Sequence, residues 1–94
     1  MARYEDTLHA VRGTKLHNFA SIAAGAVSAA AEVPVIGAKV GDVVVGVSMN
    51  VSMGGCTFLT PVITATGIAS VIAQNTTGGA VDIAEGTITV LVAK

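Results

Sequence analysis

Two stretches of the chain alternate strictly between apolar and polar positions. In residues 47–53, valine and methionine occupy the odd positions, while serine and asparagine occupy the even ones. Near the C-terminus, the apolar Ile88, Val90 and Val92 alternate with threonines at 87 and 89 and, less cleanly, with a leucine at 91. A period of two places successive side chains on opposite faces of an extended chain. Both stretches are therefore predicted to be half-buried β-strands.

Further strands are indicated between glycine-bearing turns. Residues 62–66 and 68–74 are rich in β-branched side chains and meet at Gly67, which favours two strands joined by a tight turn over one bent strand. Residues 16–22 and 26–35 flank an Ala-Ala-Gly turn at 23–25, and Gly41-Asp42 opens the run 43–45, giving two more hairpin-like units. Alanines in 23–31 favour helix, but Gly25 and Ser28 interrupt them. We expect an all-β fold, a small antiparallel β-sandwich or barrel of six to seven strands.

Charged residues gather at the N-terminus. The first fifteen positions hold five of the charged side chains, at Arg3, Glu5, Asp6, Arg12 and Lys15. We therefore expect an extended N-terminal arm, residues 1–15, followed by a β-sandwich body, residues 16–94. Within the arm, apolar side chains recur at helical spacing at positions 4, 8 and 11, and the glycine at 13 could end a short helix. A helix of one or two turns is not stable alone in water, so the arm needs a surface to lie on.

The composition suggests that the body does not fold in isolation. Apolar residues make up 52 % of the 94 residues, yet aromatic residues make up only 3 %, so the core must be built mostly from alanine and valine. Charged residues make up 12 %, about half of the roughly 25 % usual in soluble domains. A small domain with so little charge on its surface is expected to bury part of that surface against other chains. Oligomerisation is the leading candidate.

The charge pattern argues against several partners. A net charge of -1 offers no field for nucleic acid or anionic lipid, so neither is expected to bind. Residues 43–81 carry no charge, but serine, threonine, asparagine and glutamine interrupt them too often for a membrane-spanning helix. Residues 19–31 end in small side chains like a signal-peptide cleavage region, yet Glu5 and Asp6 precede them, so export is not expected.

The sequence offers no catalytic, metal or cofactor motif. Cys56 is the single cysteine and is expected to be a buried or half-buried thiol, while His9 and His17 have no ligand-type residue at metal spacing. The glycines follow neither a P-loop nor a dinucleotide pattern and are attributed to turns. Asn75-Thr76-Thr77 fits a glycosylation acceptor but is interpreted as a turn before Gly78. A small hydrolase is therefore disfavoured.

Four segments resemble a known family: FASIAAGAV (19–27), VPVIGAKVGDVVVGV (33–47), VIAQNTTGGAVD (71–82) and GTITVLV (86–92). Their order is similar to that in head decoration, or capsid cement, proteins of tailed bacteriophages and in related virion β-modules. The resemblance covers residues 19–94 and rests mostly on glycine, valine and alanine. The middle segment MNVSMGGCTF (49–58) departs from the more polar or proline-bearing loop of that pattern, which leaves the exposed face undefined.

The resemblance implies a virion structural protein that is not an enzyme and has no cofactor. Such a protein is expected to bind the major capsid protein on the outer surface of the head as a homo-oligomer, often a trimer, after synthesis in the host cytoplasm. The arm is expected to clasp a coat subunit or a neighbouring copy through Arg3, Tyr4, Glu5, Asp6, Leu8 and Arg12. The alternative is a tail-fibre module that binds a receptor or glycan, or a tail-tube subunit.

Overall fold

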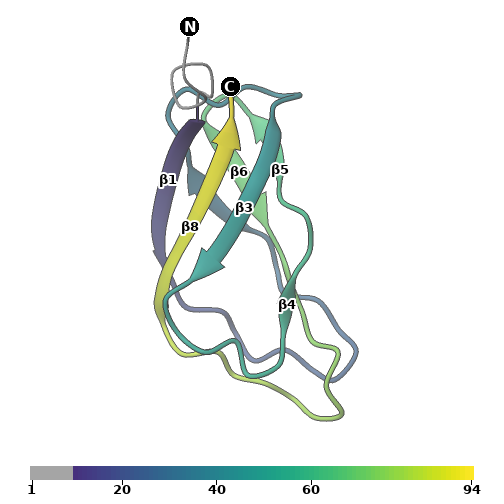
Figure 1. Cartoon of the computed structure of the whole chain (residues 1–94). Coiled ribbons are helices and arrows are strands. Elements are labelled where there is room, and N and C mark those ends of the chain that lie inside the picture. Colours follow the sequence, from purple (N-terminus) through teal and green to yellow (C-terminus); the bar gives the residue numbers. More distant parts are fainter. Residues whose placement is uncertain (1–9) are drawn as a thin grey trace, which may run out of the picture.

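Residues 10–94, the part of the chain that this computed structural model describes, fold into eight β-strands and no helix (Figure 1). The strands are β1 (Ala10–His17), β2 (Ala31–Pro34), β3 (Val43–Met49), β4 (Thr57–Phe58), β5 (Val62–Ala65), β6 (Ile68–Val71), β7 (Ala73–Gln74) and β8 (Gly86–Ala93). The predicted all-β fold is confirmed. The count exceeds the six or seven expected because β4 and β7 are two-residue strands.

Two three-stranded antiparallel sheets pack face to face, with strand orders β1-β8-β3 and β2-β6-β5 (Figure 1). A two-stranded sheet, β4-β7, lies beyond them toward the loops at the far end from the C-terminus. The central strand β8 supplies Ile88, Val90 and Val92 to the core, where they are fully buried together with Val33 and Val71 of the opposite sheet. The core side chains are mostly valine, alanine and isoleucine, as the composition requires.

The alternation in the sequence matches the observed burial. In β8 the three apolar positions of the predicted inner face are 0 % exposed. The stretch 47–53 keeps its alternation of half-buried and exposed side chains throughout, although β3 ends at Met49 and the chain bends at 50 and 51. Val47 and Met49 are only half-buried because β3 is the edge strand of its sheet within residues 10–94.

The hairpin predicted around Gly67 is present. Strands β5 and β6 pair antiparallel, and Gly67 has a positive φ of 77°, a conformation that glycine adopts without strain. The other two hairpin predictions are wrong. Residues 23–25 do form a turn, but Ile22 bridges to Val81 and Val27 to Gln74, rather than to each other. The strand after Gly41 pairs with β8. A turn motif reverses the chain without choosing its partner, and here burial against distant segments decides the pairing.

The predicted boundary of the arm is also wrong. Residues 10–15 belong to β1, which pairs with β8 along its whole length, so Val11 and Gly13 lie in a strand and not at the end of a helix. Strand pairing along eight residues outweighs a helical spacing of only three apolar positions. The rest of the predicted arm, residues 1–9, lies outside the described residues.

One long side of the sandwich is tightly closed, where β1 of the first sheet meets β2 of the second. At Gly13, a Cβ atom would lie 2.1 Å from the carbonyl oxygen of Pro34 and 2.6 Å from a methyl group of Val35. Any residue other than glycine would therefore push β1 away from the end of β2. The opposite long side, between β3 and β5, has no such contact and is described below.

Candidate interaction surface

The solvent-facing side of the β1-β8-β3 sheet is almost free of charge. The pairing register places its outward side chains in rows across the sheet, and Arg12 is the one charged residue among them. The outer face is defined by Ala10, Arg12, Thr14, Leu16, Val43, Val45, Gly46, Ser48, Thr87, Thr89, Leu91 and Ala93. Leu16, Val43 and Val45 are each more than half exposed. A flat, exposed surface of valine, leucine and threonine is typical of a protein interaction site.

A shallow hollow of about 370 Å³ interrupts this outer face beside Arg12. It exists because Gly46 has no side chain and because Val45 is an extra residue in β3: Val44 pairs with Val92 and Gly46 with Leu91, which leaves Val45 without a partner. Such a β-bulge disrupts the regular ladder at the edge of a sheet. Arg12 is the only residue of the predicted clasp that the structure describes, and it lines this hollow. Arg3, Tyr4, Glu5, Asp6 and Leu8 lie outside the described residues.

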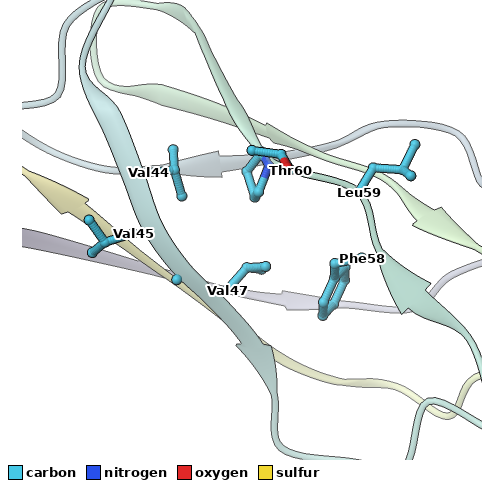
Figure 2. Close-up of a pocket in the computed structure, with 8 residues that line it drawn as sticks. Val44, Val45, Val47, Phe58, Leu59 and Thr60 are labelled. Carbon is cyan, nitrogen blue, oxygen red and sulfur yellow. The ribbon is translucent and has the colours of Figure 1, made fainter.

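A second opening, a groove of about 220 Å³, lies on the open long side of the sandwich between β3 and the chain that leads from β4 to β5. It is lined by residues 44–47 and 58–61, none of which is charged. Figure 2 shows Val44 and Val47 pointing from β3 toward the segment that carries Phe58 and Thr60. Both valines face inward but are only half-buried, because no strand within residues 10–94 covers them.

The sequence contained a signal for this groove that the pattern analysis missed. Residues 43–45 are three consecutive valines followed by Gly46. Alternating side chains cannot all face one core, so three valines in a row within a half-buried strand indicate a bulge or a second covered surface. The alternation from Val47 onward was clear, but the irregular part before it carries the groove.

Charged groups gather at the strand ends near the C-terminus. The Nζ of Lys94 lies 2.5 Å from Oδ2 of Asp42, and the backbone N–H of Lys39 donates a hydrogen bond of 2.8 Å to the same oxygen. The hydrogen bond from Lys94 and then that from Lys39 lower the pKa of Asp42 below its usual value. This exposed ion pair connects the turn before β3 to the C-terminal residue, and none of its groups lines the groove or the hollow.

Two titratable or reactive groups are explained by packing. Cys56 is a free, buried thiol, as predicted. His17 packs edge-on against Phe19 with 4.5 Å between ring centroids, and burial, followed by the positive charge of Lys15, lowers the pKa of His17. His9 lies outside the described residues. Within residues 10–94, no group of three potential metal ligands is found.

Asn75 is a fully buried polar residue just after β7, where the chain bends at residues 77–79. Its Nδ2 donates hydrogen bonds of 2.8 Å to the carbonyl oxygens of Ile22 and Gly79. Its Oδ1 accepts hydrogen bonds from the backbone N–H and the hydroxyl of Thr77. All of its polar atoms are paired, so this side chain connects two loops at one end of the molecule.

No helix long and apolar enough to cross a membrane occurs in the described part of the chain. Comparisons with protein-family models, with curated proteins and with solved structures give no match for this chain.

Proposed function

We propose that this chain is a virion structural protein, a decoration or cement subunit that binds the outer surface of the major capsid protein lattice of a tailed bacteriophage and stabilises the head. The observation that carries the proposal is the outer face of the β1-β8-β3 sheet, where exposed valine and leucine side chains accompany a single charge. The order of motifs from residue 19 to residue 94 adds the capsid as the site of assembly. The mature location is the capsid surface, after synthesis in the host cytoplasm.

The size of the outer face favours a homo-oligomer over a single copy on the capsid. Three strands of about eight residues cover roughly 14 by 27 Å, or about 400 Å² in projection. A stable interface takes about 800 Å² from each partner. The outer face alone supplies about half of this area, so a second surface must contribute. A trimer satisfies that need, because each copy then contacts two neighbours through different sides.

The experiment combines light scattering with binding to heads of the same phage assembled without this protein. The purified wild-type protein is expected to be an oligomer and to sediment with the heads, saturating at a copy number comparable to that of the coat protein. Val43→Lys places a charge on the outer face, at an exposed valine that does not line the groove, and is expected to abolish sedimentation. Val27→Lys is the matched control, because Val27 is also an exposed valine, 52 % exposed against 65 % for Val43, but lies outside both surfaces.

Three results would contradict the proposal. A protein that stays monomeric and does not bind heads is not a cement subunit. Binding at a few copies per particle would instead indicate a tail-fibre or tail-tube module. Equal loss of binding in both variants would show that the outer face has no special role.

A further inference from the structure

The most exposed large apolar side chain among the described residues is Ile36, which is 89 % exposed. It lies just after β2, on the closed long side of the sandwich. Its two neighbours both pack against β1: Val35 is fully buried beside Gly13, and a Cβ on Gly37 would lie 3.4 Å from a methyl group of Val11. Ile36 is thus held between two anchored residues while its own side chain stays in solvent.

This side chain stands at the same level of the sandwich as the groove on the opposite side. Val11, Val92 and Val44 form one row across the β1-β8-β3 sheet, and Val44 is the first β3 residue of the groove. Gly37 lies beside Val11, at the β1 end of this row. Gly13 meets Pro34 and pairs with Val90, which pairs with Val47, the last β3 residue of the groove. Residues 34–37 and 44–47 therefore span the same rows on opposite sides of one sheet.

We propose that Ile36 of one copy inserts into the groove between β3 and the β4–β5 segment of the next copy. This inference rests on the proposed function, of which it names the contact between copies. A dry cavity of about 150 Å³ holds a benzene-sized group, so the 220 Å³ groove accepts a branched aliphatic side chain. Neither the groove lining nor residues 34–37 carry a charge, so no ion is desolvated when they meet.

The equal height of the two sites determines the type of assembly. A contact between different surfaces of identical subunits is heterologous, and repeats of it either close into a ring or continue as a helix. In a helical filament, each subunit is shifted along the filament axis relative to the one before it. Because Ile36 and the groove lie in the same rows, a rotation about an axis along the strands joins them without such a shift, which a closed ring requires. A ring of three agrees with the expected trimer.

Cysteine cross-linking tests this contact directly. In a Cys56→Ala background with unchanged oligomer size, Ile36→Cys and Thr60→Cys are made separately and together, since Thr60 is an exposed residue of the groove. A disulfide needs Cα atoms within about 7 Å of each other. Mixing the two single variants under oxidation is expected to give a disulfide-linked dimer. Each single variant alone is expected to give none, and the double variant is expected to give a covalent ring.

Several outcomes overturn the inference. A dimer from Ile36→Cys alone or from Thr60→Cys alone would show a contact between identical surfaces. Failure of the mixture to cross-link, with wild-type still an oligomer by light scattering, would refute this contact and leave self-association standing. A wild-type protein that is monomeric at every concentration would refute the proposed self-association as well.

A charge at the contact provides an independent measurement. Ile36→Asp is expected to raise the dissociation constant of the oligomer at least tenfold, while the exposed position leaves the fold of the subunit intact, as circular dichroism would verify. Val27→Asp, at an exposed valine that does not line the groove, is expected to leave the dissociation constant unchanged. An equal effect of the two substitutions would contradict the proposed contact.

Discussion

Two strand glycines, Gly13 in β1 and Gly46 in β3, have opposite surroundings and give a sharp test of the packing. A Cβ on Gly13 would meet the carbonyl oxygen of Pro34 at 2.1 Å, whereas ordinary contact begins at 3.4 Å, so Gly13→Ala requires β1 and Pro34 to separate by about 1.3 Å. A Cβ on Gly46 would have no atom of residues 10–94 within 4 Å. The two substitutions add the same methyl group to one sheet.

The backbone beside Gly13 cannot move easily. The N–H of Val35 donates a 2.8 Å hydrogen bond to the carbonyl oxygen of Gly67, and Pro34 pairs with Ile68. Forcing an extra carbon into such a site costs about 1–3 kcal/mol. In a domain of this size, each 1 kcal/mol shifts the melting temperature by about 4–8 °C. We therefore expect Gly13→Ala to lower the melting temperature by about 5–20 °C.

Gly46→Ala is the matched control. Alanine restricts the unfolded chain more than glycine does, which stabilises a protein by about 0.4–1 kcal/mol where the native backbone accepts it. Its melting temperature is expected to rise by a few degrees. Both variants and the wild type are compared by thermal and urea unfolding at one protein concentration, low enough for the subunit to be monomeric. Equal stability of the two variants would refute the close contact between β1 and β2.

Three further predictions concern single side chains. In Asn75→Asp, the carbonyl oxygens of Ile22 and Gly79 face a buried carboxylate instead of an amide donor. We expect the free energy of unfolding, measured in urea, to fall by an amount on the order of 3 kcal/mol. The loss should be smaller at acid pH, where the carboxyl is protonated. The hydrogen bond from Lys94 lowers the pKa of Asp42, so the pair stabilises the fold at pH values above the unfolded pKa of the carboxyl. This stabilisation is lost as the pH falls through the folded pKa. In Asp42→Asn, the urea midpoint should therefore change less with pH below pH about 4 than it does in the wild type. The pKa of His17 is lowered by burial, so stability falls as pH drops below about 6.5, and His17→Gln should reduce this fall.

The sequence predicts this fold best where one face of a strand is fully buried. Strand β8 is central in its sheet, and its period of two was visible because Ile88, Val90 and Val92 all face the core. The hairpin at Gly67 was visible because its strands are adjacent in both sequence and space. Where partners are distant, as for Ile22 with Val81, local signals could only locate the turn.

The candidate surface was harder to predict for a physical reason. The low share of charged residues indicates that part of the surface is covered by other chains. Composition alone does not show which residues form that part of the surface. The groove arises from an irregularity, the bulge at Val45, together with the divergence of β3 from the β4–β5 segment. Both depend on how the two sheets pack. The predicted clasp rests on local sequence near the N-terminus, and among its residues only Arg12 lies on the described surface.

Gly46 itself connects the fold to the proposed assembly. Glycine within a strand costs roughly 0.5–1 kcal/mol relative to alanine. At Gly13 this cost is offset because β1 can approach Pro34 closely. At Gly46, a Cβ would have no atom of residues 10–94 within 4 Å. The φ of Gly46 also lies outside the left-handed region that favours glycine. Within the described residues, only the bulge at Val45 accounts for a glycine at this position. A strand glycine is explained when another chain approaches closely, and Gly46 lines both the groove and the hollow of the outer face. Gly46→Ala should therefore stabilise the isolated subunit yet weaken its self-association by light scattering; a variant that assembles as tightly as wild-type would separate this glycine from the interface.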